Sequence, residues 1–166
     1  MFEADADDLR RRILFPSEFE ADYEERVLQE ARAIVQRRFT GMDVLALPRT
    51  VQEYLTIRLA GYSEEMFASL FLTTHHQVIA FEILFRGTVD GCGVHERVIA
   101  KRALANNAAV VILVHNHPSG IAEPSEADVA VTRKVREALG LLDIRLLDHF
   151  IVGGNAAVSM AERGYM

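Results

Sequence analysis

Two histidines and an aspartate lie close together in the sequence and have the types and spacing of metal ligands. His115 and His117 end an apolar run, and side chains two residues apart in an extended chain point the same way. Asp128 follows in the first turn of a helix that the sequence predicts from Ser125. Two imidazoles and one carboxylate, with a fourth position left open, form the ligand set of a catalytic zinc site rather than a structural one.

The start of this helix also has an interpretation that needs no metal. Ser125-x-x-Asp128 has the pattern of a capping box, in which the serine hydroxyl and the aspartate carboxylate bond each other's backbone amides. A histidine at a strand end, taken singly, is also commonly a hydrogen-bonded structural residue. The capping interpretation explains the helix start but leaves the paired histidines without a role, whereas a metal site accounts for all four residues.

The apolar run before the histidines predicts the strand that positions them. Residues 108–114 are continuously apolar and rich in β-branched side chains, as in a strand buried on both faces. Pro118, Gly120 and Pro124 then break regular structure between this strand and the helix at Ser125. The three ligands are therefore expected at the end of a buried strand, where open α/β sheets place their sites.

The N-terminal part of the chain predicts an arm and two helices. Residues 1–17 are expected to form the arm, and helical spacing of apolar residues predicts a helix from Phe19 to Phe39, before Gly41. Thr50 is expected to be the N-cap of a second helix. The apolar residues of this second helix share one side, and they are Val51, Tyr54, Leu55 and Leu59.

Further along the chain, strands and helices alternate, which implies an α/β layer architecture. Residues 66–72 and 77–85 predict two strands joined by a hairpin turn, in which His75 and His76 face solvent. A helix and two more strands complete the predicted elements, over residues 96–106, 143–154 and 156–160.

Two polar residues near the predicted site are expected to be structural. Asn116, between the two histidines, points away from them if the segment stays extended. His149 lies on a predicted strand and is expected to be a hydrogen-bonded core histidine that supports the site rather than a ligand. Gly153-Gly154, after the same strand, predicts a turn.

The segment HNHPSG at residues 115–120, followed by Pro-Ser-x-x-Asp, resembles the JAMM (JAB/MPN) metallohydrolase signature in the form carried by RadC-like proteins. The resemblance extends from about Leu59 to the C-terminus. It implies a JAMM/MPN fold similar to cytidine deaminases, an α/β fold with a mixed β-sheet flanked by helices and, here, an N-terminal helical extension. On this basis residues 1–45 form the N-terminal arm and helix, and residues 46–166 form the RadC-like JAMM/MPN domain. The segments that carry the resemblance are residues 85–89, 101–120, 146–154 and 158–164.

The resemblance also implies an activity, the zinc-dependent hydrolysis of peptide or isopeptide bonds. Zinc would be bound by His115, His117 and Asp128 and would lower the pKa of its bound water toward about 7. JAMM enzymes use a glutamate at the start of an early core strand as general acid/base, and Glu65 is the best match in position. Ser125 matches the residue that helps to hold the oxyanion.

Two other glutamates are candidates for the proton carrier. Glu64 is next to Glu65, and a slip of one residue reverses the face to which a strand residue points. Glu96 lies in Val94-His-Glu-Arg-Val98, where many RadC-like chains have Val-His-Pro-Arg-Glu. The sequence therefore leaves Glu64 and Glu96 as alternatives to Glu65.

Composition narrows the classes of protein and of site. The net charge of −6 argues against a generally basic surface for nucleic acid. Cys92 is the only cysteine, which excludes an internal disulfide and a multi-cysteine zinc site. No apolar run approaches the roughly 18 residues that suggest a transmembrane helix. The first residues lack the apolar core of a signal peptide, so a cytoplasmic protein that does not bind membranes is expected.

Two non-enzymatic functions remain as alternatives, a DNA-repair-associated protein and an MPN scaffold. The first is suggested by the name RadC, and the acidic charge does not favour DNA as a partner. Many RadC-like proteins carry an N-terminal helix-hairpin-helix region, and the chain has no hairpin glycine pattern of that kind, so a short form is expected. A scaffold has no need of three metal ligands. The expected partner is a peptide or protein substrate, and edge strands and the N-terminal helices would support a homodimer.

Overall fold

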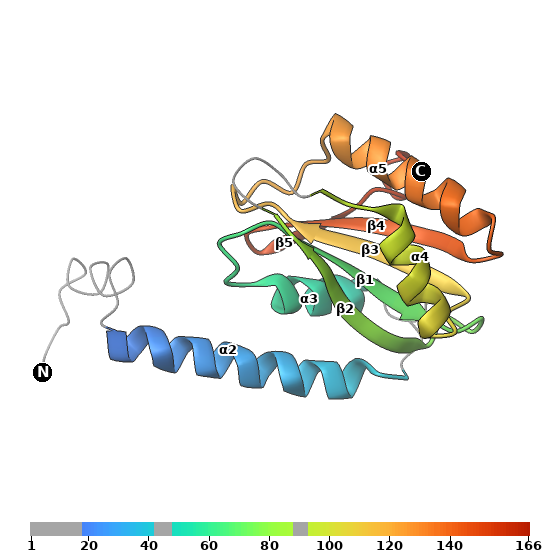
Figure 1. Ribbon diagram of the computed structural model, residues 1–166. Coiled ribbons are helices and arrows are strands. Elements are labelled where there is room, and N and C mark those ends of the chain that lie inside the picture. Colours follow the sequence, from blue (N-terminus) through green and yellow to red (C-terminus); the bar gives the residue numbers. More distant parts are fainter. Residues whose placement is uncertain (1–17, 42–47, 88–92) are drawn as a thin grey trace, which may run out of the picture.

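The computed structural model describes residues 18–41, 48–87 and 93–166, and Figure 1 shows a central sheet with helices on both faces. The expected arm at residues 1–17 lies outside the described residues, and so does Cys92. Within the described ranges, no helix combines the length and the apolar character needed to cross a membrane.

The first helix, α2 (Glu18–Phe39), begins within one residue of its expected start and is attached to the rest of the molecule through its second half. Gln36 there accepts a 2.7 Å hydrogen bond from the Tyr54 hydroxyl, and the Arg32 guanidinium lies 4.5 Å from the Tyr62 ring centroid. In the first half, Tyr23 and Val27 are exposed, and Figure 1 shows this part extending past the sheet.

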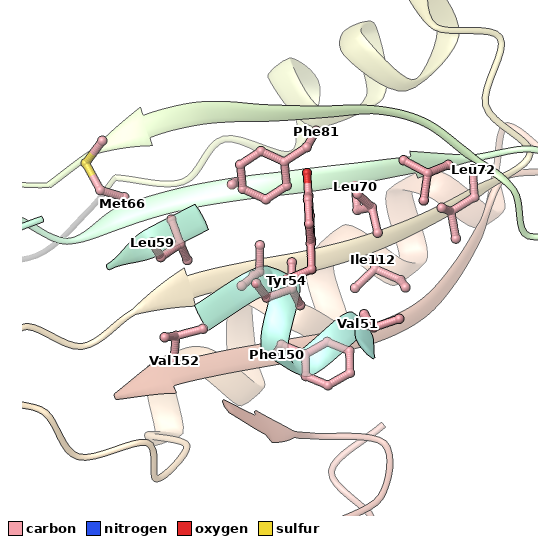
Figure 2. Packing of buried hydrophobic residues seen from close by; sticks show 14 of the residues in the cluster. Val51, Tyr54, Leu59, Met66, Leu70, Leu72, Phe81, Ile112, Phe150 and Val152 are labelled. Atoms are coloured by element: carbon pink, nitrogen blue, oxygen red, sulfur yellow. The ribbon is translucent and has the colours of Figure 1, made fainter. Parts of the chain in front are cut away.

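The second helix, α3 (Pro48–Leu59), has the buried side that its apolar spacing predicts. The expectation that Thr50 is its N-cap is wrong, because the helix begins at Pro48 and Thr50 lies in the first turn. Proline is favoured at the first helical position since its fixed φ suits the helix and its missing N–H would be unpaired there. Figure 2 shows the buried side of α3 against the sheet, with Val51 and Tyr54 close to Ile112 and Phe150, and Leu59 on the side of Met66 and Val152.

A five-stranded sheet with the order β2-β1-β3-β4-β5 forms the centre of the molecule. β3 and β4 are parallel and the other neighbouring pairs are antiparallel, so the sheet is mixed, as the resemblance implied. Every element expected after α3 is present, with ends shifted by at most two residues. The elements are β1 (Met66–Leu72), β2 (Val78–Arg86), α4 (Glu96–Ala105), β3 (Val110–Asn116), α5 (Glu126–Gly140), β4 (Arg145–Gly153) and β5 (Ala156–Ser159).

The side chains of β3 alternate between two apolar layers, because neighbours in a strand point to opposite faces. Ile112 and Val114 belong to the layer under α3, whereas Val111 and Leu113 belong to the layer under α4 and α5. The strand is buried along its whole length, as its continuous apolar run predicts. The same alternation carries His115 to the α4/α5 face and Asn116 to the opposite face.

Candidate metal centre

His115 is the next-to-last residue of β3, because the strand ends at Asn116, two residues later than the sequence predicts. Its side chain is fully buried, and its ring stacks on Phe67 of β1 with the planes 8° apart and the centroids separated by 5.7 Å. The parallel strands β3 and β4 end at this same edge of the sheet, and the antiparallel strand β1 begins there. The expected location at a strand end is therefore the one observed.

His117 lies just beyond β3 and is held by two backbone carbonyls. Its own backbone N–H donates to the Val152 carbonyl at 2.8 Å, which continues the pairing with β4. Its ring Nδ1 lies 2.8 Å from the Ile121 carbonyl. A carbonyl oxygen only accepts, so Nδ1 is the donor. This bond turns Nε2 of His117 toward His115, whose Nε2 is 2.9 Å away.

The loop between His117 and α5 folds back onto the end of β4, and two glycines allow it to do so. Gly120 has a φ of +80°, a left-handed conformation that L side chains rarely adopt. At Gly153, an added Cβ would lie 2.5 Å from the backbone nitrogen of Ala122. The sequence predicted only a turn at Gly153-Gly154, and Gly154 does lie in that turn. The close approach at Gly153 is a functional feature that sequence reasoning missed.

Asp128 makes the expected capping box with Ser125, and the same carboxylate also reaches the two histidines. Oδ2 of Asp128 accepts from the backbone N–H and the hydroxyl of Ser125, both at 2.7 Å. Ser125 Oγ in turn accepts from the Asp128 N–H at 3.2 Å. Oδ1 is directed to the histidines and lies 3.0 Å from His115 Nε2, while Oδ2 lies 3.5 Å from His117 Nε2. The cap therefore orients the carboxylate for the site.

Electrostatics at this group favour a bound cation. Burial works against ionisation of Asp128, but the close contacts with His115 and His117 outweigh it and keep the pKa of Asp128 well below its usual value. The hydrogen bond to Asp128 in turn raises the pKa of His117, against the opposing effect of burial. Two ring nitrogens 2.9 Å apart repel each other if both present lone pairs, so a proton or a metal ion between them is favourable.

The geometry of the three side chains fits a tetrahedral ion. In the part of the chain that the structure describes, His115, His117 and Asp128 are the one group of three or more such residues with ligand atoms close enough to share an ion. Ligand atoms bound to tetrahedral zinc at about 2.0–2.1 Å would be roughly 3.3 Å apart. The Nε2 atom of His115 lies 2.9 Å from Nε2 of His117 and 3.0 Å from Oδ1 of Asp128, slightly below that value, and the 3.5 Å contact of His117 is to the other carboxylate oxygen, Oδ2. His115, His117 and Asp128 could therefore hold a metal ion.

A cleft of about 460 Å³ opens beside this group, and its lining includes His117 and Asp128. Its walls come from the start of β1, the start of α4 and the first turns of α5, and its lining includes Glu65, Glu96 and Ser125. The β1–β3 register pairs Phe67 with His115, so continuing it by two residues places Glu65 opposite His117. Glu64 is exposed and is not part of the lining. The cleft thus contains two of the three candidate glutamates.

Asn116 explains why Glu65 lies at this place. Its side chain points away from the histidines, as expected, and bonds the segment that leads into β1. Oδ1 accepts from the Met66 N–H at 2.7 Å, and Nδ2 donates to the Glu64 carbonyl at 3.1 Å. These two bonds bracket Glu65 on either side along the chain. The side chain between the two histidines thereby fixes the position of the glutamate.

His149 is a fully buried histidine on β4, as the sequence predicts, and its ring bonds to His115. Its Nε2 lies 2.9 Å from Nδ1 of His115, and its Nδ1 lies 2.6 Å from Thr132 Oγ1 on α5. Burial is the main cause that lowers the pKa of His149 well below its usual value, so the ring is neutral. Sequence reasoning missed Thr132, although its position four residues after Asp128 places it on the same side of α5.

The two histidines at the hairpin lie away from this group, in agreement with the sequence. His75 is exposed, and Thr73 to His76 form the expected turn between β1 and β2. His76 has a φ of +58° and accepts a hydrogen bond from Arg145 through its ring. It is half-buried, so the expectation that it faces solvent is only partly met.

Comparison with known proteins places this arrangement in a family. Residues 45–165 match a family model described as RadC-like JAB domain. The chain is 48% identical over 167 residues to a UPF0758 protein of Azotobacter vinelandii, with 100% of this chain and 74% of that protein covered. A UPF0758 protein of Vibrio cholerae is 50% identical over 144 residues, with 87% of this chain and 90% of that protein covered.

A third relative is longer than the matched region. The UPF0758 protein of Nitrosococcus oceani is 59% identical over 124 residues, which are 75% of this chain and 55% of that protein. The chain thus spans little more than half the length of this relative. The names of these relatives state no activity. From the family match and the extent of these identities, we conclude that the chain belongs to the RadC-like JAB domain family.

Proposed function

We propose that the protein is a zinc-dependent hydrolase of peptide or isopeptide bonds. The observation that carries the proposal is the convergence of His115 Nε2, His117 Nε2 and the Asp128 carboxylate beside a cleft that also contains Glu65. Two imidazoles and one carboxylate are a common ligand set of catalytic zinc, which leaves a position for water or substrate. When bound, zinc supplies an acidified water and polarises the carbonyl under attack.

Glu65 is the residue that moves the proton in this proposal. From the wall of the cleft, its carboxylate takes a proton from the attacking water and delivers it to the leaving amine. The backbone on both sides of Glu65 is held by Asn116, which keeps this residue at the wall of the cleft. Glu96 lines the same cleft and is the alternative for this role, whereas Glu64 is not part of the lining.

Ser125 is proposed to stabilise the oxyanion that forms on the attacked carbonyl. Its hydroxyl lines the cleft but donates to Oδ2 of Asp128, so the oxyanion role requires that hydrogen to turn toward the substrate. The backbone N–H of Ser125 would keep Asp128 oriented meanwhile, because it donates to the same oxygen at 2.7 Å.

Metal analysis and turnover of single variants test the proposal. We expect about one zinc per chain, lost in a folded His117→Ala variant, since an N/N/O site cannot keep zinc tightly with one ligand removed. Glu65→Gln should keep the zinc and lower hydrolysis of a quenched peptide mixture, or of an ε-linked lysine isopeptide, by about 10²- to 10⁴-fold. Glu64→Gln is the matched control and should retain activity.

Other outcomes would point elsewhere. Stoichiometric zinc in His117→Ala would remove the ligand set. Full activity in Glu65→Gln with loss in Glu96→Gln would move the proton carrier to α4. A zinc-loaded protein that hydrolyses neither probe but binds DNA with a steep salt dependence would favour the non-enzymatic, DNA-associated alternative.

A further inference from the structure

A chain of hydrogen bonds runs behind His115, on the side away from the cleft. It begins at Nδ1 of His115, passes through both ring nitrogens of His149 and reaches Thr132 Oγ1. It ends at the backbone carbonyl of Asp128, which lies 2.5 Å from Thr132 Oγ1. His115 and His149 are fully buried and Thr132 is 2% exposed, so water does not compete for these bonds.

The hydrogens of this chain can be placed from its end backward. The Asp128 carbonyl only accepts, and two oxygens 2.5 Å apart require the Thr132 hydroxyl hydrogen between them. Thr132 has no second hydrogen, so toward His149 it can only accept, and Nδ1 of His149 must donate. His149 is fully buried between His115 and Thr132, and a buried imidazole without a carboxylate partner carries a single proton, so with that proton on Nδ1 its Nε2 presents a lone pair.

The hydrogen bond between His149 and His115 decides which ring nitrogen of His115 carries the proton. Because His149 Nε2 accepts, His115 must donate through Nδ1, and Nε2 of a neutral His115 carries no proton. We propose that Thr132 and His149 are positioning residues that fix the tautomer of His115, leaving its Nε2 free to bind the metal ion. The inference rests on the metal site of the proposed function but not on hydrolysis.

The two histidine ligands reach the same tautomer by different routes. His117 donates from Nδ1 directly to the Ile121 carbonyl. His115 has an aromatic ring, Phe67, against its face and a second histidine beside its Nδ1, so its proton is fixed through two intermediate residues. Asp128 lies at both ends of this arrangement, with its carboxylate beside His115 Nε2 and its carbonyl as the final acceptor.

Two substitutions at Thr132 separate the effect of its hydroxyl group from the effect of its side-chain volume. Thr132→Ser keeps the hydroxyl, and Thr132→Val has nearly the same shape without it. In the valine variant, His149 Nδ1 has no acceptor, so the ring is expected to carry its hydrogen on Nε2 and donate to His115. His115 would then carry its hydrogen on Nε2, the atom needed by the ion.

The first readout is the tautomer itself, measured by ¹⁵N NMR on histidine-labelled, metal-free protein. We expect Nδ1–H at His115 and at His149 in the wild type and in Thr132→Ser, and Nε2–H at both in Thr132→Val. The measurement on the wild type does not depend on any variant folding. An Nε2–H tautomer of His115 or of His149 in the wild type would overturn the inference.

The second readout is zinc affinity, measured by competition with a chelating dye. Thr132→Val should bind zinc about 10- to 100-fold more weakly than the wild type, and Thr132→Ser should bind it about as tightly. Ser69→Ala is the matched control, because Ser69 Oγ is also a buried hydroxyl but has no hydrogen-bond partner among the described residues. It should leave zinc affinity unchanged.

The outcomes separate this inference from the proposed function. Equal zinc affinity in the valine and serine variants would remove the positioning role and leave the hydrolase proposal intact. If the protein hydrolyses neither the peptide nor the isopeptide probe but shows the expected tautomers and zinc affinities, the result would count against the hydrolase and support the positioning role.

Discussion

The two faces of the central sheet are built from the same strands but differ in what they bury. Under α3 the layer is mainly apolar, with Leu55 of the helix packed on the side that includes Leu70 and Ile112, and the buried Asn116 on this face bonds the segment before β1. Under α4 and α5 a similar apolar layer covers most of the sheet. Near the C-terminal ends of β3 and β4, however, this second face also buries His115 and His149.

The difference lies in how directional the interactions are. Apolar packing depends mainly on the area removed from water and has no preferred angle, whereas hydrogen bonds weaken steeply when their geometry changes. Substitutions under α3 should therefore lower stability without changing metal binding. Substitutions that displace side chains near the candidate metal centre should lower metal affinity strongly even where they lower the free energy of unfolding only a little.

The largest loss of stability is expected from a cavity under α3. Leu55 is fully buried, so Leu55→Ala should lower the free energy of unfolding by about 2–5 kcal/mol. Zinc should raise the melting temperature of this variant as much as that of the wild type, since bound ligand stabilises through affinity alone. Thermal unfolding with and without zinc measures both effects. A Leu55→Ala variant that no longer responds to zinc would contradict the separation of the two faces.

A smaller loss of stability, but a change in the metal centre, is expected at Gly153. An added methyl group would meet the backbone of Ala122, so Gly153→Ala should cost about 1–3 kcal/mol and displace the loop that orients His117. Its stabilisation by zinc should shrink. Gly140→Ala is the matched control, because a Cβ on this helical glycine has nothing within 4 Å and should stabilise by about 0.5–1 kcal/mol. An undiminished zinc effect in Gly153→Ala would show that the loop is not positioned by this contact.

The smallest effect is expected at Ser125. Ser125→Ala removes the side-chain part of the cap and should cost about 0.5–2 kcal/mol, measured by urea unfolding. Zinc affinity should fall by less than about tenfold, because the Ser125 backbone N–H still holds Asp128. Ser63→Ala, at an exposed serine away from the helix cap, is the control and should stay within about 0.5 kcal/mol of the wild type. A loss of turnover much greater than the loss of zinc affinity would support the oxyanion role, and equal losses would leave Ser125 as a cap only.

Much of the fold and of the ligand set follows from local patterns. The β-branched run before His115 predicts a buried strand, and the alternation along a strand places His115 and His117 on one face. Ser125-x-x-Asp128 predicts the helix start, because a capping box depends only on residues within one turn. The error at Thr50 is of the same local kind, since a proline two residues earlier is an equally good helix start.

The amino-acid sequence by itself determined the strand, the helix and the three candidate ligands, because each of these depends on neighbours in the chain. Only the tertiary structure decided between Glu64 and Glu65 as a residue of the cleft, and only it brought Thr132 and His149 together behind His115. The close approach of the loop at Gly153 was likewise set by the tertiary structure. These contacts join β1, β3, β4 and α5 across long sequence separations, and no local spacing specifies which side chains meet when separate elements pack.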